Sequence, residues 1–258
     1  MSEAAPKKKK FTEIANKNFI MLFIAYTIIC LGHSMTSATS SAGWRAGGLD
    51  MTVVGLIASA QAWAAFVIRP FSAPIVDRGN KKKIYFMAVA LFTVVLFMYS
   101  RSMVDISWAV PTRIIHGIAW TFISTVTAVV LSEYVPREDL GTAMGFFMVS
   151  QLIASAISQP IAFELANRFS YATMFMIFGC IVAVGCLLVL LTSPTKTPER
   201  QGSFFSGIKL NNLFAKEAVM PMLLNICFQG TRSGFTVFLA GFALEDLGIA
   251  NVGIFATV

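Results

Sequence analysis

The chain alternates between long apolar runs and short polar connections. A helix needs about 20 apolar residues to cross a bilayer, and most of the runs approach or exceed that length. Inside hydrocarbon every backbone polar group needs a partner within the protein, so the runs predict helices rather than open strands. The runs cover residues 19–40, 52–76, 84–100, 107–131, 141–165, 171–192 and 218–241, and an eighth begins before the chain ends. The pattern predicts an all-α, polytopic membrane protein.

The composition supports this prediction. Of the 258 residues, 56% are hydrophobic and 13% are charged, whereas soluble domains average about 25% charged residues. The mean hydropathy is +0.72. The net charge of +7 would by itself suit a nucleic-acid partner, so the positions of the basic residues become the deciding observation.

The basic residues follow a membrane topology. If the N-terminus lies in the cytoplasm, the connections on that side hold fourteen Lys and Arg residues, and those on the other side hold only Arg45, Arg101 and Arg168. This bias is typical of cytoplasmic loops. The charge therefore orients the chain in a cell membrane with a cytoplasmic N-terminus, and no nucleic-acid partner is expected.

A repeat with an offset of 198 to 199 residues suggests two related parts. "VGLIAS" at 54–59 returns as "VGIFAT" at 252–257. A polar stripe on one helix face is also repeated, with the same spacings of 4, 3 and 4: Tyr26, Cys30, His33 and Ser37, then Asn225, Gln229, Arg232 and Thr236. Chance similarity is the alternative. If the repeat is real, we expect a tail (1–18), a six-helix bundle (19–192), a cytoplasmic linker (193–217) and the start of a second bundle (218–258), as in a fragment of a roughly twelve-helix protein.

The stretch "FSAPIVDRGNKKKIYF" at 71–86 gathers charges between two apolar runs. It resembles the signature loop of the major facilitator superfamily, in which Gly, three residues, Asp, Arg, one residue and Gly precede basic residues. Asp77 and Arg78 match, while Ala73 replaces the first glycine and the second appears one place early, as Gly79. Arg113-Ile-Ile-His116-Gly117 resembles the Arg-x-x-x-Gly of the family's fourth helix.

The resemblance implies two six-helix halves with a substrate site between them, and transport of a small organic solute by alternating access. It also implies that Asp77, Arg78 and Lys82 form a cytoplasmic latch. Independently, a carboxylate such as Asp77 could cap a helix N-terminus, and a neighbouring cation could bind carbonyls at a helix C-terminus. The alternative is a loop that only sets topology, which explains the lysines without needing Asp77.

Polar residues within the spans are the candidate substrate site, because charges inside a bilayer usually face a cavity or a partner. The resemblance implies that helices one, four and seven border the cavity. The candidates are His33, Arg113, Gln151, Asn225, Gln229 and Arg232. For His33 the alternative is an internally hydrogen-bonded helix histidine. Every fourth residue from Ser150 to Ala162 is small, which favours close helix packing.

No Asp or Glu lies mid-span in the first six predicted helices. The arginines therefore lack a nearby carboxylate, which favours an organic anion as substrate. Alternatively, acids on other helices pair with the arginines and leave an apolar pocket for a drug-like solute. The protein would then be a multidrug efflux carrier, and a sugar efflux carrier of the same superfamily is a further alternative. Coupling to a proton would then depend on His33, on Glu164 or on residues beyond the first six helices.

The sequence shows no convincing nucleophile–base set, phosphate-binding loop or metal-ligand cluster. An enzyme is therefore not expected, nor is a cofactor. A non-transporting membrane sensor with the same fold stays open, and so do the coupling ion and the oligomeric state. The expected partners are a small-molecule substrate and the lipid bilayer.

Overall fold

The computed structural model describes residues 16–192 and scattered positions between 219 and 242. Residues 16–192 form six long helices with two short 3-10 turns. They are α2 (Lys17–Ala46), α3 (Met51–Arg78), α4 (Lys81–Ser102), η1 (Ile106–Trp108), α5 (Ala109–Tyr134), η2 (Arg137–Asp139), α6 (Leu140–Arg168) and α7 (Tyr171–Leu191). All six long helices are long and apolar enough to cross a membrane. The first six predicted spans are thus confirmed, the linker lies outside the described residues, and so do most of the seventh and eighth spans.

Polar side chains fix where four of these helices begin. Asn16, Asp50, Asn80 and Ser170 each accept a hydrogen bond from a backbone N–H in the first turn of the helix that follows. Such caps satisfy donors that have no partner inside the helix. Asn80, not Asp77, caps α4, because Asp77 still belongs to the last turn of α3.

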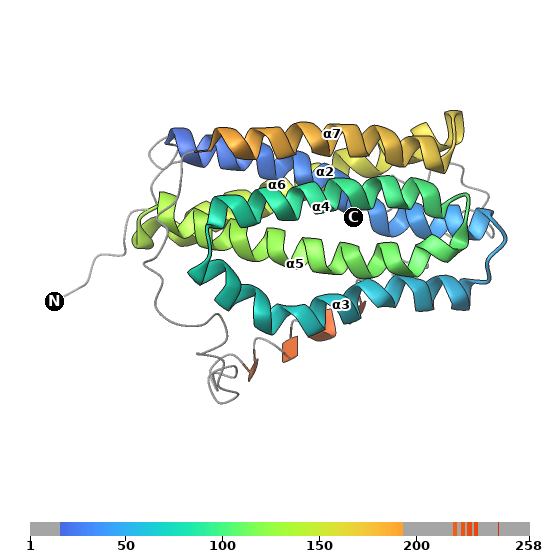
Figure 1. Ribbon diagram of the computed structural model, residues 1–258, viewed down its shortest axis with the longest axis horizontal. Coiled ribbons are helices and arrows are strands. Elements are labelled where there is room, and N and C mark those ends of the chain that lie inside the picture. Colours follow the sequence, from blue (N-terminus) through green and yellow to red (C-terminus); the bar gives the residue numbers. More distant parts are fainter. Residues whose placement is uncertain are drawn as a thin grey trace.

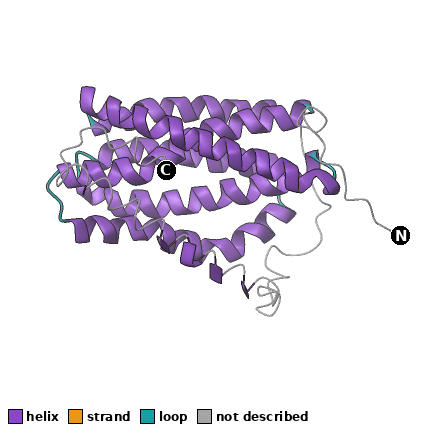
Figure 2. Ribbon diagram, turned by 180° about the vertical axis from the view of Figure 1, so that it is seen from behind, coloured by secondary structure: helices purple, strands orange, loops and turns teal. Residues whose placement is uncertain are grey.

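The six helices lie roughly side by side and form one bundle (Figures 1 and 2). α3 packs on α5, α5 on α4, α4 on α7, α7 on α2, and α2 on α6. Lighter contacts join α2 to α5 and α3, and α5 to α6. α2 and α5 therefore meet in the middle of the bundle, and residues on these two helices can contact each other.

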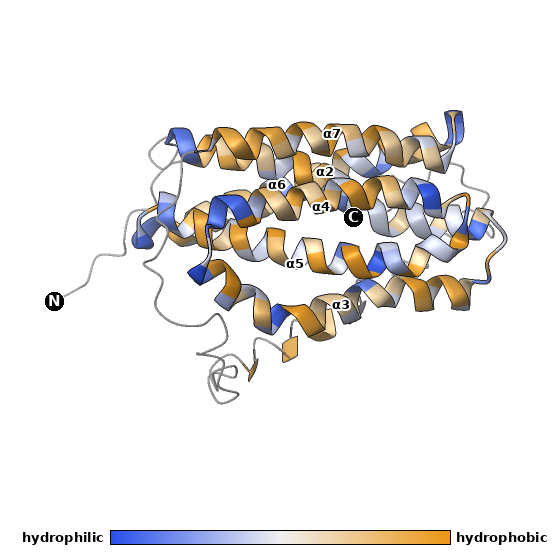
Figure 3. Cartoon of the chain, in the orientation of Figure 1, coloured by the Kyte–Doolittle hydropathy of each residue, from blue (hydrophilic) through white to orange (hydrophobic). Residues whose placement is uncertain are grey.

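Hydrophilic segments gather at the helix ends, and others lie within α3 and α5 (Figure 3). The connections 47–50, 103–105 and 169–170 lie at one end, here called the Gly47 end. The connections 79–80 and 135–139 lie at the other, the Asn80 end. The interiors of α3 and α5 are thus the places to look for functional groups.

The small-residue stripe on α6 is a packing surface. Its members are at most 1% exposed: Ser150, Ala154, Ser158 and Ala162. α6 packs chiefly on α2. The predicted close helix packing is therefore confirmed.

Candidate functional site

The two histidines of the chain contact each other although 83 positions separate them. His33 of α2 and His116 of α5 share a hydrogen bond of 3.0 Å between Nδ1 and Nε2, respectively. The other nitrogen of His116, Nδ1, lies 2.9 Å from the hydroxyl of Tyr99 on α4. His33, His116 and Tyr99 therefore form one hydrogen-bonded chain, here called the histidine relay, across three helices.

Aromatic rings enclose the histidine relay. The Trp120 ring stacks on His33 with the centroids 3.3 Å apart and the planes 4° from parallel. The Phe92 ring lies 5.1 Å from His116, and Tyr99 stacks on Phe175 of α7 at 5.0 Å. His116 and Tyr99 are fully buried. The polar groups of the relay thus have each other as partners within an apolar wall.

Arg113 lies one turn before His116 on α5 and is 2% exposed. One terminal nitrogen donates to Oε1 of Gln61 on α3, and the other donates to Oγ of Ser40 on α2, both at 2.7 Å. The guanidinium carbon lies 5.2 Å from the Trp44 ring centre and 5.6 Å from that of Tyr99. Neutral acceptors and aromatic faces hold this cation, and it joins α5 to α3 and α2.

The positive charge of Arg113 meets no carboxylate inside the described bundle. α2, α4 and α7 contain no Asp or Glu. The acidic residues of α3, α5 and α6 lie near helix ends, at Asp77, Glu133 and Glu164. The guanidinium therefore contributes a positive potential inside the bundle, toward the Gly47 end of α5.

Gly117 places α3 against this part of α5. A Cβ atom at Gly117 would collide with the backbone oxygen of Gln61 and would lie 3.0 Å from the Cβ atom of Ala64. The absence of a side chain therefore brings Gln61 within reach of Arg113. This explains why Arg113 and Gly117, the two residues of the Arg-x-x-x-Gly pattern, occur together.

The predicted latch residues lie at the Asn80 end. Asp77 is exposed and Arg78 is half-buried. Lys82 donates from Nζ to the backbone oxygens of Leu190 and Thr192, both at 2.7 Å, so it binds carbonyls at the C-terminus of α7. Lys82 therefore holds two helices of this bundle together, which leaves Asp77 as the exposed member of the set.

The neighbouring Lys81 also acts inside the bundle. Its Nζ atom lies 2.9 Å from Oε1 of Glu133 at the end of α5, and its side chain is 6% exposed. Asn16 adds a third link, because its side-chain amide donates to the backbone oxygen of Tyr134 at 2.8 Å. α4, α5, α7 and the start of α2 are thus joined at the Asn80 end.

The structure brings together only some of the predicted cavity residues. His33 contacts His116, and Arg113 lies against the Tyr99 ring, whereas Gln151 is half-buried on α6. Asn225, Gln229 and Arg232 lie outside the described residues.

Sequence reasoning missed His116, Tyr99, Gln61 and Trp120. One signal pointed to His116: it is the second of two histidines and lies one turn from Arg113 on the same face.

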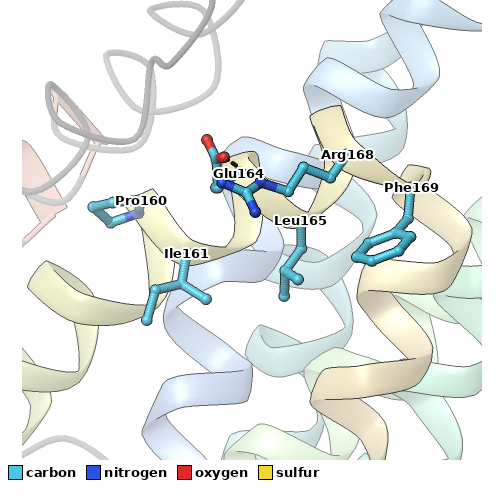
Figure 4. Close-up of a pocket in the computed structure, with 6 residues that line it drawn as sticks. All are labelled: Pro160, Ile161, Glu164, Leu165, Arg168 and Phe169. Atoms are coloured by element: carbon cyan, nitrogen blue, oxygen red, sulfur yellow. Dashed lines mark hydrogen bonds and ion pairs between the residues drawn. The ribbon is translucent and has the colours of Figure 1, made fainter.

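A shallow recess lies away from this cluster, on α6 at the Gly47 end. It is lined by Pro160, Ile161, Glu164, Leu165, Arg168 and Phe169 (Figure 4). Glu164 accepts a hydrogen bond of 2.6 Å from Arg168, so the charges at the recess are paired. Because a single helix and the residue after it build the recess, it is not the candidate site.

The sequence model of the Major Facilitator Superfamily matches residues 22–258. The chain belongs to the major facilitator superfamily. It is therefore a multi-pass membrane protein of a transporter family, and the resemblance drawn from the loop at 71–86 is confirmed. The all-helical membrane fold is confirmed as well, and so is the expectation that the family is not one of enzymes.

Two curated proteins with transporter names are similar to the chain. The "Putative multidrug resistance protein MdtD" of Pectobacterium atrosepticum is 27% identical over 71% of the chain. The "Probable galactarate/D-glucarate transporter GudP" of Escherichia coli is 24% identical over 69%. The match covers 38% and 41% of those two proteins, respectively, so the chain spans about two fifths of the length of these curated relatives.

A solved structure shows the same fold. The bacterial homolog of the human lysosomal transporter Spinster, in an inward-facing and unoccupied conformation, superposes with a TM-score of 0.63 at 16% identity. The superposition covers 93% of this chain and 59% of that one.

Proposed function

We propose that the chain supplies the first helix bundle of a secondary transporter that moves a small organic solute by alternating access. The observation that carries the proposal is the buried polar cluster in a member of this superfamily, where α2 meets α5. Buried polar groups at membrane depth are costly and usually functional. In transporters built from repeats, substrate sites lie near the midplane between the repeats.

The preferred solute in this proposal is an organic anion. Arg113 brings a positive charge that no carboxylate in the described helices neutralises, and its potential is weakly screened in an apolar surround. Both nitrogen atoms at the end of its side chain are already bonded to Gln61 and Ser40. Arg113 therefore favours an anion through its charge rather than through direct contact in this arrangement. The likeness to a protein named as a galactarate/D-glucarate transporter, whose named solutes are dianions of sugar acids, agrees with this preference.

A drug-like solute is the second candidate. It is favoured by the likeness to proteins named for multidrug resistance and by the aromatic rings around His33. A flat, apolar solute could stack on such rings without a charge partner. The two candidates differ in the charge that the site selects, so a comparison of charged solutes separates them.

The orientation follows from the bias in basic residues. We infer that the Asn80 end faces the cytoplasm of the cell membrane, since Lys81, Lys82, Lys83 and Arg137 lie there. The opposite end holds Arg45, Arg101 and Arg168, each in the last turn of its helix. There they offset the negative end of the helix dipole. Labelling of single cysteines at 48 and 138 from one side of the membrane tests this orientation.

Uptake of labelled D-glucarate and of a lipophilic cation into liposomes containing the complete gene product tests the function. Arg113→Gln removes the charge, and Arg113→Lys keeps it. The expected result is glucarate uptake that Arg113→Lys largely retains and Arg113→Gln lowers roughly tenfold, as for one lost charge interaction of about 1.4 kcal/mol. Arg168→Gln is the matched control at an exposed arginine. Cation uptake that is indifferent to Arg113→Gln would favour the drug-like solute, and no flux of either probe would favour a sensor.

A further inference from the structure

The histidine relay offers a function beyond solute selection. An imidazole exchanges its proton near neutral pH and both its nitrogens form directed hydrogen bonds. We propose that His33 and His116 form a proton-binding site in the middle of the bundle, in which His33 carries the added proton and Tyr99 ends the relay. Only the claim that this proton drives solute movement rests on the transport function proposed above.

The surroundings assign the added charge to His33. His116 is fully buried and lies one turn from Arg113, so a charged His116 would set two cations close together in an apolar region. His33 is half-buried, and its ring lies flat on the indole of Trp120. The face of an indole attracts a cation. Trp120 therefore stabilises the protonated form of His33.

The relay has two hydrogen-bond arrangements that differ by one proton. With His33 neutral and protonated at Nε2, His116 donates from Nε2 to His33 Nδ1, and the Tyr99 hydroxyl donates to His116 Nδ1. With His33 charged, His33 donates from Nδ1 to His116 Nε2. The hydrogen of His116 then lies on Nδ1 and donates to the Tyr99 oxygen. Adding one proton thus reverses both hydrogen bonds and leaves His116 and Tyr99 neutral.

The helices around the pair present few other ionisable groups. α2 itself has Cys30 one turn away, α4 presents Tyr99, and α5 presents Arg113. α7 presents apolar side chains, with Val182 against Gly32 of α2 and Phe175 against Tyr99.

The remaining two helices add no carboxylate. α3 reaches this region through the neutral Gln61, and α6 has no ionisable side chain before Glu164 near its far end.

The two positive charges link the proton to an anion. A protonated His33 and Arg113 together place two positive charges inside the bundle. A bound anion stabilises this doubly charged state and so raises the affinity of His33 for the proton. Protonation of His33 raises the affinity for the anion by the same factor, because such coupling is reciprocal. The site is therefore suited to carry one proton together with an anionic solute.

Tryptophan fluorescence of the chain in detergent, without solute, tests the proton site. A charged imidazole stacked on an indole quenches it, so we expect a one-proton loss of fluorescence between about pH 8 and pH 5. His33→Gln and Trp120→Phe remove this step, whereas Trp63→Phe, at an indole 67% exposed, retains it. A step that survives in His33→Gln, or no step in the parent, overturns the proposal.

Tyr99→Phe tests the relay separately. It removes the hydroxyl oxygen that accepts from Nδ1–H of His116 when His33 is charged. The charged state then contains a buried donor without an acceptor, which is costly. The fluorescence step should therefore move to lower pH. An unmoved midpoint in a folded Tyr99→Phe variant overturns the relay. 15N-histidine NMR, with the two rings assigned by His33→Gln and His116→Gln, shows which ring is charged.

Proteoliposomes containing the complete gene product test the coupling. An inward proton gradient should accelerate glucarate uptake by the parent, and uptake by His33→Gln should be the same with and without the gradient. Parent uptake that ignores the gradient overturns the coupling. If no solute is carried, the transport function fails, while the fluorescence titration still decides whether the proton site exists.

Discussion

Arg113 depends on shape as well as charge. Its planar group donates to Gln61 and Ser40 at once, which a lysine ammonium on a flexible stem does poorly. The residue therefore combines a structural role, joining three helices, with the electrostatic role proposed for solute selection. The two roles can be separated by substitution.

Arg113→Lys should lower stability although it keeps the charge. Loss of one of the two charge-assisted hydrogen bonds costs about 1.5–3 kcal/mol. Thermal unfolding in detergent measures the effect. Arg168→Lys is the control, because that side chain is mostly exposed where it pairs with Glu164, and such pairs contribute about 1 kcal/mol or less. Equal melting temperatures for Arg113→Lys and the parent would contradict the bridging role.

The sequence predicts only some of the buried polar residues of the candidate site. A polar side chain in an apolar run is visible without a structure, so the sequence identifies His33 and Arg113 as candidates. It does not identify their partners, because helical periodicity gives the face of a residue and not its height relative to another helix. The contact between His33 and His116 depends on how α2 and α5 align, and Gln61 depends on the close approach that Gly117 permits.

At the scale of elements, glycines distinguish packed helix faces from open ones. Gly117 contacts the backbone of α3, whereas a Cβ atom at Gly145 of α6 would meet nothing within 4 Å. Both residues lie inside long helices. They form a matched pair for testing whether α3 and α5 pack as closely as described.

Gly117→Ala should destabilise the bundle by about 1–3 kcal/mol, because overpacking forces the backbone apart. Gly145→Ala should leave stability unchanged or raise it by up to about 1 kcal/mol through helix propensity. Chemical unfolding in detergent compares the two variants. A larger loss for Gly145→Ala than for Gly117→Ala would disprove the close contact of α3 and α5.

Asp50 gives the start of α3 a dependence on pH. Hydrogen bonds from Thr52, by its hydroxyl and its backbone N–H, hold the pKa of Asp50 below its ordinary value, which is about 3.9. A lowered folded pKa means that the stabilisation is complete above the ordinary pKa and is lost as the pH falls through the lower folded value. The stability difference between the parent and Asp50→Ala should therefore stay constant from about pH 8 to pH 5 and shrink below about pH 4. A difference that shrinks only on the alkaline side would contradict this assignment.

The element boundaries show where sequence patterns are reliable. The first six apolar runs marked the cores of six helices, but most of the helices extend beyond their runs. α2 continues to Ala46, through a stretch rich in Ser and Thr. Hydroxyls there donate to backbone oxygens one turn earlier, as Thr39 does to Met35 and Ser41 does to Ser37. Hydropathy scales count such residues as polar, although inside a helix their hydroxyls form hydrogen bonds with the backbone of the same helix.

At the scale of the whole molecule, the charged residues of the Asn80 end differ in their contacts. Lys82 is bonded within the bundle, whereas Asp77 is exposed. If Asp77 belongs to a latch that engages another part of the transporter, the two residues should affect different measurements.

Asp77→Asn should lower the transport rate roughly tenfold, which corresponds to a barrier raised by about 1.4 kcal/mol. The melting temperature of the chain should not change. Lys82→Gln should lower the melting temperature, since the C-terminus of α7 loses two hydrogen bonds. Flux measurements and thermal unfolding on both variants check the two expectations. Normal flux in Asp77→Asn would leave the loop as a topology signal only.

The connection between α3 and α4 limits how this bundle can move. Only Gly79 and Asn80 separate the two helices, so three steps between Cα atoms, about 11 Å at full stretch, are the longest tether available at that end. The adjoining Lys81 is itself tied to α5, and Lys82 to α7. The tether limits how far α3 can slide along α4, and the two lysine contacts hold α4, α5 and α7 together at the same end. If the chain works by the alternating access proposed above, we therefore expect these helices to tilt together as one rigid lever, with the tether near its tip.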